Sequence, residues 1–483
     1  MNNGPASEKQ FTKIVSQAHR RIAWRLLPFL MLLYFVAYFD RVSLSYAGPG
    51  GMNAELALTA NGFGFAAGLF FIGYTFLELP SNIALHRFGA RAWLARIIVT
   101  WGIIQTAIAF VPNAETLYVL RFTLGVAEAG FVPGVLYYFT LWFNHSQRAR
   151  ATAWFLFASV LATTVGAPLA ATLIDLGDRL DLFGMSGWRF LIFASGLPAV
   201  VLGVTAYFYL SDSPSQAKWL SAEERTAVIE SIASDARAVN VPRTSVRQTL
   251  ASPWVWVVGL SYMSIVYGSY ALTFFLPTFI EGLQQQYGLI LTPLQRSLIV
   301  AVPFAVGGAS QLTIGRLGDK YGHAGYLSAM CTTIGAVGAL VAAFADSPLG
   351  MLFGLCLFAI GAFGGPVLLF PLATKLYVGI GAATALAVVT MHGGVGGFVG
   401  PYVTGALIDV SGSVEIAMLV IAALLLLGGF LAITADRAVS RRVLKYRSSI
   451  PAADPTSGPI AEGADKNKVT AQDLNKVQTR GRP

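Results

Sequence analysis

The sequence predicts an all-α membrane protein with twelve transmembrane helices in two six-helix, pseudo-symmetric halves. Only 12% of its 483 residues are charged and 55% are hydrophobic, whereas a typical soluble domain has about 25% charged residues. Apolar runs of about 20 residues, the length that crosses a bilayer, recur twelve times along the chain. Short motifs also recur between the two halves. These observations exclude a soluble enzyme, a collagen-like fibre and a disordered chain.

The apolar runs define the predicted helices in chain order. The first run is too long for the apolar part of a cleavable signal peptide and is followed by a regular series of further runs, so we expect it to be a true transmembrane helix. The twelve predicted spans are residues 24–47, 61–85, 92–111, 116–141, 151–174, 188–210, 254–280, 297–315, 325–345, 349–374, 380–408 and 414–435.

A long polar connection, residues 211–252, separates the two predicted halves. It has a helical pattern over residues 221–233 (SAEERTAVIESIA). The predicted organisation is therefore a cytoplasmic N-terminus (1–23), a first half (24–210), a cytoplasmic central loop (211–252), a second half (253–436) and a cytoplasmic tail (437–483). The tail beyond about residue 447 is polar, rich in Pro, Gly and Ala and nearly free of aromatic residues, and is predicted to be disordered.

Lysine and arginine residues predict the orientation of the spans. Cytoplasmic segments are enriched in these residues. Of the 33 in the chain, 28 lie in segments on the side of the N-terminus and three on the other side. Both termini are therefore predicted to be cytoplasmic. The same topology explains the net charge of +9, so no nucleic-acid partner is expected.

The two cysteines exclude redox and thiolate chemistry. Cys331 and Cys356 both lie inside apolar runs, and two such residues build neither a disulfide framework nor a thiolate metal site. We expect no metal and no other cofactor.

Two basic loops mark an internal repeat. The loop after the second span reads NIALHRFGAR (82–91), and the loop after the eighth reads GRLGDKYGH (315–323), 233 residues later. The same offset relates Pro168 to Pro401. Parallel repeats place a binding site near the midplane, which opens alternately to each side. We predict that the loops gate this movement through Arg87, Gly89, Arg91, Gly315, Asp319, Lys320 and Gly322; the alternative is that their basic residues serve topology alone.

Four ionisable residues lie inside predicted spans, where charge is costly and indicates function. Asp40 and Arg41 lie about six residues from the outer end of the first span, roughly 9 Å deep at 1.5 Å per residue, and Arg121 lies at a similar depth in the fourth. Glu128 is two turns further along, near the midplane. Two guanidinium groups at one depth can bind a carboxylate from both sides, so the predicted substrate is an anion.

The two carboxylates are predicted to neutralise the arginines in the empty site and to carry protons. A carboxylate in a low-dielectric cavity can take up a proton near neutral pH. The alternative is that Asp40 and Glu128 pair with the arginines for structural reasons only. Shifted by 233 residues, the four charged positions fall on uncharged residues, so the charge chemistry is predicted to reside in the first half. These four are Thr273, Phe274, Gly354 and Gly361.

Several segments together resemble the anion:cation symporter family within the major facilitator superfamily, over residues 21–437. They include the Asp40-Arg41 pair, FFIGYTFLELPSNIALHRFGAR, LRFTLGVAEAGFVPGVLYYFTLWF, LSDSPSQAKWLSAEE and GGVGGFVGPYVTG. Phthalate, tartrate, hexuronate and galactonate permeases belong to this family. The resemblance implies the major facilitator fold, substrate carboxylate binding by Arg41 and Arg121, proton coupling by Asp40 and Glu128, and a substrate contact from Tyr74.

The sequence departs from this family at two kinds of position. The first basic loop has Asn82 and His86 where the superfamily signature has Gly and Asp. Sugar-acid members are similar to one another in placing Gln in the fifth span and Asn in the eleventh, whereas this chain has Ser159 and Gly394. Fewer amides for hydroxyl groups favour an aromatic or dicarboxylic acid over a sugar acid.

Further residues are predicted to line the site. Tyrosines of the first and seventh spans, Tyr38 and Tyr270 among them, offer ring surfaces, and Ser159 offers a hydroxyl; aromatic residues also serve as filler in membrane helices. His392 is the only histidine well inside a span, where it senses protons, binds substrate or simply packs.

The predicted function is proton-coupled symport of a small organic carboxylate by alternating access. The predicted partners are the organic anion, the proton and the lipid bilayer of a bacterial inner (plasma) membrane, with a monomer sufficient for activity. A sodium-coupled carrier or an anion exchanger could use the same arginines. A non-transporting membrane sensor is a further alternative, although it would not need proton carriers. A membrane-embedded enzyme is disfavoured because the chain has no HExxH, Walker A or clustered His and Cys motif.

Overall fold

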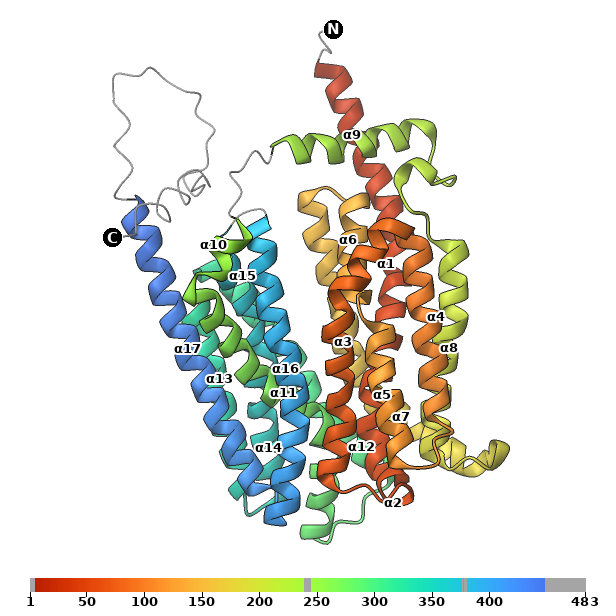
Figure 1. Ribbon diagram of the computed structural model, residues 1–483, viewed down its shortest axis with the longest axis vertical. Helices are drawn as coiled ribbons and strands as arrows, with labels where there is room; N and C mark the ends of the chain where they lie inside the picture. The colour runs from red at the N-terminus through yellow and green to blue at the C-terminus, as the bar shows by residue number, and fades with distance from the viewer. Residues whose placement is uncertain (1–4, 239–244, 376, 378–379, 448–483) are drawn as a thin grey trace. The chain divides into compact units, whose positions relative to one another are not determined.

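The computed structural model describes residues 5–238, 245–375, 377 and 380–447, which are helical and contain no strand (Figure 1). Eleven helical segments in this part of the chain are long and apolar enough to cross a membrane. The predicted all-α membrane fold is therefore confirmed. Of the twelve predicted spans, the third forms a helix that is not among the eleven, because Arg91 and Arg96 in its first two turns lower its hydropathy.

The predicted spans of the first half form seven helices, because one span is broken. The fourth predicted span contains two helices: the first ends at Glu128 and the second begins at Phe131. The helices are α1 (Pro5–Ala47), α3 (Ala60–Phe88), α4 (Ala90–Ile108), α5 (Ala114–Glu128), α6 (Phe131–Trp142), α7 (His145–Leu180) and α8 (Gly187–Tyr209), with a π-helical turn η1 (Gly48–Met52) and a single turn α2 (Asn53–Glu55) after α1.

The break between α5 and α6 results from a glycine in the left-handed conformation. Gly130 has φ 87°, a value that other residues adopt only under strain. A Cβ atom at Gly130 would also collide with Ser81 of α3. The break leaves Glu128 as the last residue of α5, at a point where the helix axis is interrupted inside a membrane span.

The second half also contains a broken span. After α14 (Pro348–Ala359) the chain continues through a π-helical turn, η4 (Ile360–Gly364), and a 3-10 turn, η5 (Pro366–Leu368), into α15 (Leu369–Thr374). The remaining helices are α11 (Pro253–Gln286), α12 (Pro293–Tyr321), α13 (Ala324–Phe344), α16 (Ile380–Ser411) and α17 (Glu415–Arg447). Residues after 447, where the disordered tail is predicted, lie outside the described residues.

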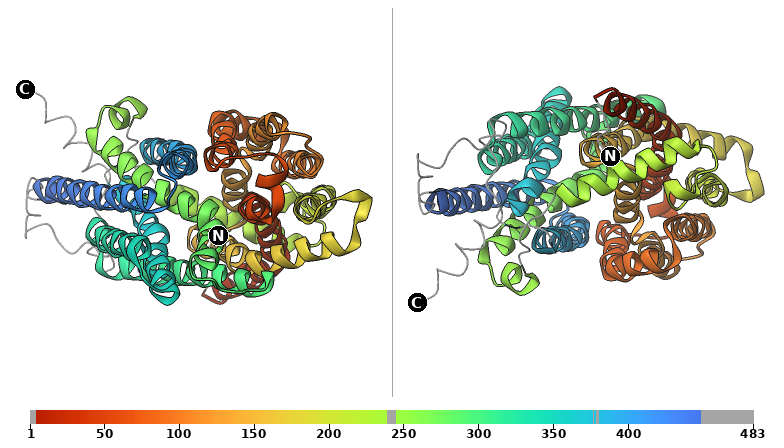
Figure 2. Two further views of the ribbon diagram at one scale, coloured as in Figure 1. Left: turned by 90° about the horizontal axis from the view of Figure 1, so that it is seen from below. Right: turned by 90° about the horizontal axis from the view of Figure 1, so that it is seen from above.

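The central connection contains the predicted helix. It forms α9 (Ala222–Ala238), followed by the short α10 (Val246–Leu250). Figure 1 shows α9 crossing near the first turns of α1, and the right-hand view of Figure 2, seen from above, shows the same crossing. An ion pair of 2.9 Å between Arg21 and Glu224 joins the two helices.

The chain forms two compact units. The first comprises residues 1–239, 270–305 and 398–417, and the second comprises 240–269, 306–397 and 418–483. The division falls inside α11, α12, α16 and α17. The domain boundaries that the sequence suggests for the two halves stay a prediction.

In the first unit, α3 and α5 pack closely because each carries a glycine at the contact. A Cβ atom at Gly73 would lie 2.9 Å from the backbone nitrogen of Val126, and one at Gly125 would lie 2.9 Å from that of Tyr74. Small residues let helix backbones approach in this way. The contact places Phe70 and Tyr74 of α3 directly beside α5.

Candidate anion-binding site

Arg41 and Glu128 form a buried ion pair in the first unit. Nη2 of Arg41 on α1 donates a hydrogen bond to Oε1 of Glu128, the last residue of α5. Arg41 is 9% exposed and Glu128 2%. The structure therefore brings together two of the four charged residues singled out by the sequence. The broken span lets the Glu128 carboxylate reach α1.

Aromatic rings surround the Arg41 guanidinium. Its Cζ atom lies 4.8 Å from the ring centroid of Phe70 and 5.6 Å from those of Tyr38 and Tyr74. A guanidinium within about 6 Å of a ring face is attracted by the ring quadrupole. Tyr38 and Tyr74, both predicted to contact substrate, thus lie beside Arg41.

Arg121 lies on the same aromatic ring as Arg41. Its side chain is 1% exposed, its Nε donates to the backbone oxygen of Ala66 at 3.2 Å, and its Cζ lies 5.4 Å from the Phe70 centroid. Among the described residues, Nη2 of Arg121 has no hydrogen-bond partner, and no carboxylate lies within 4.0 Å of its guanidinium. Phe70 therefore has two buried guanidinium groups near its ring, of which only one is paired.

Asp40 faces a different set of neighbours. Its Oδ2 accepts a hydrogen bond of 3.0 Å from Nε1 of Trp101 on α4, and Nε2 of Gln105 donates to its backbone oxygen at 3.4 Å. Successive residues of a helix point about 100° apart, so Asp40 and Arg41 address different sides of α1. Among the described residues, Glu128 is the carboxylate that forms an ion pair with one of the two arginines; neutralisation of an arginine by Asp40 stays a prediction.

The other predicted contacts of the first unit lie on neighbouring helices. Ser159 of α7 donates to the backbone oxygen of Leu156 at 2.8 Å and also lies within hydrogen-bond reach of the Tyr34 hydroxyl. The Tyr34 ring stacks on Phe155 at 4.5 Å. The Tyr270 ring, from α11, lies 4.3 Å from that of Phe71 on α3. Tyr34 and Tyr270 are both close enough to Arg41 to interact with it electrostatically.

His392 belongs to the second unit and has local partners there. Its Nδ1 lies 2.8 Å from the backbone oxygen of Val388, one turn earlier in α16, and its ring lies 5.6 Å from that of Trp256. A Cβ atom at Gly259 would lie 2.8 Å from its Nδ1. These contacts describe a packed, hydrogen-bonded histidine. A proton-sensing or substrate-binding role for it stays a prediction.

The first basic loop is docked on the segment that follows α8. The backbone nitrogen of Arg91 donates to Oδ1 of Asp212 at 2.8 Å, and its Nε lies 3.9 Å from Oδ2. Gly89 has φ 87°, and a Cβ atom there would lie 2.9 Å from Asp212. Arg87 is exposed and stacks over Phe88. Asp212 is thus a partner of Arg91, and Gly89 lies where a side chain would collide with that carboxylate.

The second basic loop has a related arrangement in the second unit. Gly322 has φ 70°, and Lys320 lies 5.2 Å from the Tyr321 ring. No atom of the described chain lies within 4 Å of a Cβ built on Gly315. The Asp319 side chain lies outside the described residues. At the start of α13, the backbone nitrogen of Gly325 donates to Oδ2 of Asp436 at 3.1 Å.

Comparison with known proteins identifies the family. The sequence profile of the Major Facilitator Superfamily matches residues 30–383 and 291–470. The chain belongs to the Major Facilitator Superfamily. Members of this superfamily are transporters and not enzymes, so the chain is an integral membrane transporter.

Relatives within the Major Facilitator Superfamily cover most of the chain. A protein of Agrobacterium vitis that is named for tartrate transport is 36% identical over 86% of this chain and 94% of its own length. The metabolite transport protein NicT of Pseudomonas putida is 33% identical over 86% and 93%. The inner membrane transport protein RhmT of Escherichia coli is 30% identical over 85% and 93%.

Solved structures of the Major Facilitator Superfamily share the fold. A bacterial homologue of the human lysosomal transporter Spinster has a TM-score of 0.69 at 16% identity, over 88% of this chain and 98% of that one. The xylose transporter XylE of Escherichia coli has a TM-score of 0.64 at 14% identity, over 94% and 99%. At such identities the similarity concerns the fold alone.

Some site residues of this superfamily member could not be singled out from its sequence. Phe70, between the two arginines, is one of 32 phenylalanines, and nothing in its local sequence distinguishes it. Trp101, Asp212 and Asp436 were also missed. The available signal for the two aspartates was a lone carboxylate just after the last span of each half. Among the described residues no group of three His, Cys, Asp or Glu could hold a metal.

Proposed function

We propose that the protein is a proton-coupled symporter of a small organic carboxylate, with an aromatic or dicarboxylic acid favoured over a sugar acid. One observation carries this proposal: Arg121 is 1% exposed and, among the described residues, is not paired with a carboxylate. A buried cation without a counter-ion is costly. An anionic substrate beside Arg121 and Arg41 removes that cost. Arginine also presents planar, bidentate donors suited to a carboxylate.

The relatives support an anionic substrate. Two of them are named for tartrate transport, and tartrate is a dicarboxylate. At identities of 35–36%, we take from these relatives the carboxylate class of the substrate and not its identity.

The Arg41–Glu128 pair supplies a coupling mechanism. While Glu128 is ionised, it neutralises Arg41 and competes with the substrate for its guanidinium. When Glu128 takes up a proton, its hold on Arg41 weakens and Arg41 becomes available to the substrate carboxylate. Proton and anion therefore bind together, and each favours the other's binding by the same factor. Release of the anion restores the pair and expels the proton.

Asp40 is proposed to carry a second proton. Its carboxylate lies 1% exposed against Trp101 on the other side of α1, so its protonation does not compete with the substrate directly. One proton with a monocarboxylate is electroneutral, whereas two protons carry one net charge inward. For a monocarboxylate, membrane-potential dependence of uptake that is lost in Asp40→Asn would assign this second proton to Asp40. For a dicarboxylate, two protons are electroneutral, so potential dependence that appears in Asp40→Asn would assign it.

The walls beside the arginines favour a flat or compact acid. Tyr38, Phe70 and Tyr74 present rings toward Arg41, and the Ser159 hydroxyl already donates to a backbone carbonyl. A heavily hydroxylated substrate would leave several hydroxyl groups without partners, which costs affinity. We infer that ring stacking takes the place of hydroxyl recognition here.

The experiment that tests the proposal is external pH in lightly buffered cells expressing the protein. Aromatic acids, dicarboxylates and sugar acids are added one class at a time. Symport predicts alkalinisation with one class, absent in Arg121→Ala and present in Arg179→Ala, which removes an exposed arginine at the end of α7. Alkalinisation that persists in Arg121→Ala would contradict the anion site.

A change of medium distinguishes a proton symporter from the two alternative carriers, a sodium-coupled carrier and an anion exchanger. A sodium-coupled carrier requires sodium and leaves external pH unchanged. An exchanger requires a counter-anion inside the cell, so uptake fails in vesicles that contain none. A non-transporting sensor binds the acid without moving it in any of these experiments.

The proposed location is a bacterial inner (plasma) membrane with both termini cytoplasmic. Bacterial relatives, one of them named an inner membrane protein, support the location, and the distribution of basic residues supports the orientation. In this orientation the Arg91–Asp212 contact lies on the cytoplasmic side, where the loop is proposed to gate release of the anion.

A further inference from the structure

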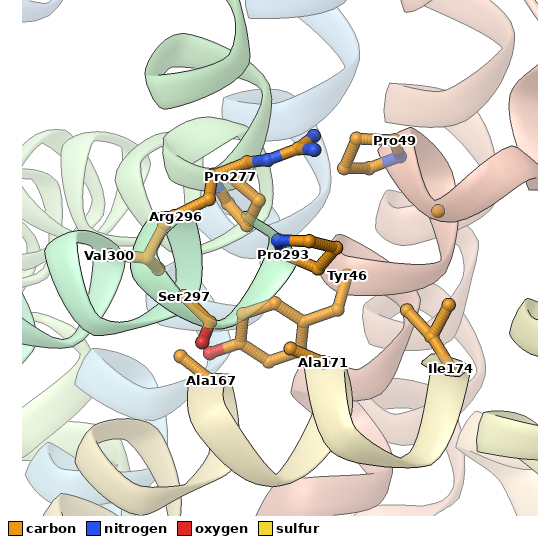
Figure 3. A pocket seen from close by; sticks show the side chains of 11 residues that line it. Tyr46, Pro49, Ala167, Ala171, Ile174, Pro277, Pro293, Arg296, Ser297 and Val300 are labelled. Carbon is orange, nitrogen blue, oxygen red and sulfur yellow. The ribbon is translucent and has the colours of Figure 1, made fainter. Parts of the chain in front are cut away.

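A mostly apolar pocket, which neither Arg41 nor Glu128 lines, lies within the first unit. Its cavity volume is about 210 Å³, below the range of about 300–1,000 Å³ of typical ligand pockets, so it suits only a small molecule. The ends of α1, α7 and α11, the turn η1 and the start of α12 line it (Figure 3). In the orientation proposed above, all of these helix ends face the outside.

The pocket walls are mostly apolar, with one cation. Its apolar surface includes Pro49, Ala171, Ile174 and Val300. Arg296, at the start of α12, is the one charged residue among those that line it, and Figure 3 shows this side chain reaching toward Pro49. An apolar cavity with a single guanidinium matches a molecule that has an apolar body and one anionic group.

Arg296 is only loosely paired. Its Nη1 lies 3.6 Å from Oε1 of Glu281, longer than the 2.7–2.9 Å of a charge-assisted hydrogen bond. Its Nε is buried and has no hydrogen-bond partner among the described residues. The Arg296 side chain is 28% exposed, so some of its N–H donors remain for a ligand.

Tyr46 adds an unused hydroxyl to the same pocket. The residue is 7% exposed and lines the pocket, and its hydroxyl has no hydrogen-bond partner in the part of the chain that the structure describes. Buried hydroxyls are normally bonded. A missing partner at the wall of a cavity therefore indicates a group that enters from the cavity. Ser297, also in the wall, donates to the backbone oxygen of Leu294 at 2.8 Å.

We propose that this pocket is a separate binding site for an organic monocarboxylate with an apolar or aromatic body. The carboxylate binds the Arg296 guanidinium and accepts a hydrogen bond from the Tyr46 hydroxyl, while the hydrocarbon part contacts Pro49, Ala171 and Ile174. Glu281 weakens this site by partly neutralising Arg296, so it releases the anion readily. The choice of an organic acid rests on the proposed function; the site itself rests on the pocket.

The role of such a site is capture of the anion at the outer end of the helices. A weak site there raises the local concentration of anion next to the entrance, as charged clefts do. Its apolar walls also reject heavily hydroxylated acids before they reach the arginines. This would make the pocket a selectivity site that acts before the buried one.

The test is protection of a cysteine placed in the pocket wall. Ala171→Cys introduces a thiol at a partly exposed wall position, and its reaction with N-ethylmaleimide is followed on purified full-length protein by mass spectrometry of the peptide that contains it. The probe anion is benzoate. We expect saturating benzoate to slow the labelling about tenfold.

Three further substitutions, each made separately in the Ala171→Cys protein, show whether the pocket residues are responsible for the protection. Arg296→Gln should abolish protection without changing the labelling rate in the absence of benzoate. Tyr46→Phe should raise the benzoate concentration needed for protection several-fold. Arg179→Gln, which removes the charge of an exposed arginine on α7, is the matched control and should be protected like the parent.

Arg121→Ala separates this proposal from the proposed function. Protection that persists in Arg121→Ala supports an independent pocket site, even if the protein transports no organic acid at all. Loss of protection in Arg121→Ala would overturn the proposal, because the effect would then arise from the buried site. Protection that survives Arg296→Gln, or no protection of the parent by benzoate, would overturn it as well.

Discussion

The two halves of the chain differ at corresponding repeat positions. In the first half these positions carry the charges of Arg41, Arg121 and Glu128, buried around Phe70. In the second half, the positions 233 residues after Arg121 and Glu128 are Gly354 and Gly361. A Cβ atom at Gly361 would lie 2.6 Å from the Cα of Gly335, and one at Gly354 would lie 2.8 Å from the oxygen of Gly338.

The difference shows two uses of one helix. In the first half, α5 carries charge toward α1 and α3. In the second half, α14 and η4 press their backbones against α13 through glycine, with no room for a side chain. A buried charged side chain needs room and a polar partner, whereas close backbone packing leaves no room for any side chain. One position therefore cannot serve both purposes. We infer that the first half binds the anion and that the second half provides a tightly packed counterpart.

The largest effect is expected when Arg121 is removed. Arg121→Ala takes away the unpaired guanidinium and should lower uptake at low substrate concentration about 100-fold, as truncation of one member of a buried charged contact costs roughly 2–5 kcal/mol. Initial uptake of radiolabelled acid in proteoliposomes measures this. Arg121→Lys should recover only part of the loss, because lysine keeps the charge but not the bidentate geometry.

The control for this experiment is Arg179→Ala, which removes an arginine whose side chain is 74% exposed. Its uptake should stay within about twofold of the parent, since exposed ion pairs contribute little. Equal losses in Arg121→Ala and Arg179→Ala would mean that general charge, and not the buried site, controls uptake.

The next largest effect concerns coupling. Glu128→Gln keeps a hydrogen-bonding side chain beside Arg41 but cannot change its charge. Arg41 is then permanently unpaired, so the anion should bind equally well at every pH, whereas the parent should bind it more tightly as pH falls and Glu128 becomes protonated. Anion exchange should continue, but accumulation driven by a proton gradient should fall to the level that the second proton, proposed for Asp40, sustains alone.

Binding of the acid to purified protein between pH 5 and 8 measures the first effect, and accumulation in proteoliposomes measures the second. The matched control is Glu115→Gln, an exposed residue in the first turn of the same helix, which should keep the pH dependence of the parent. A Glu128→Gln protein that accumulates the acid along a proton gradient to the same level as the parent would exclude Glu128 as a proton carrier.

The positions of the helices could be predicted from the sequence because membrane burial imposes a strong, local signal. Long apolar runs and the distribution of basic residues gave the spans, and the rarity of charge at bilayer depth pointed to Arg41 and Glu128. Neutralisation of the arginines by carboxylates could be expected without knowledge of the fold, since a buried charge requires a partner, but the specific Arg41–Glu128 pair could not.

The direction in which each charge points could not be predicted in the same way. Depth follows from sequence position, but the side of α1 that faces α4 or α5 depends on packing between helices. The Asp40 carboxylate therefore accepts a hydrogen bond from Trp101, a partner that the sequence did not indicate. The break at Gly130 was also missed, because 50 glycines in a membrane protein serve mostly as packing residues, and only its φ of 87° marks this one as a turn.

A smaller effect, on stability, is expected in the second half. Gly361→Val inserts a side chain where a Cβ atom alone would lie 2.6 Å from Gly335, and overpacking of this kind costs about 1–3 kcal/mol. The temperature at which the detergent-solubilised protein loses its monodisperse gel-filtration peak should fall. Gly282→Ala is the control, since no described atom lies within 4 Å of its Cβ position. If both variants melt like the parent, the close packing of α13 on η4 is not limiting for stability.

The smallest expected effect is a difference in stability between variants of the two aspartates that cap the third helix of each half. Asp212 receives the backbone nitrogen of Arg91 and its side chain is 29% exposed, whereas Asp436 receives that of Gly325 and is 2% exposed. Loss of a capping acceptor costs about 0.5–2 kcal/mol, and we expect Asp436→Ala near the upper end and Asp212→Ala near the lower.

Thermal unfolding of both alanine variants measures this difference, with Asp436→Asn and Asp212→Asn as controls that keep an acceptor oxygen. The exposed contact has a second role in our proposal, since Asp212 holds the loop of Gly89 and Arg91 that gates release. Asp212→Ala should therefore change the transport rate more than it changes stability, and Asp436→Ala should do the reverse. If Asp212→Ala alters stability alone, the loop is a structural cap and the gate must be sought elsewhere in the chain.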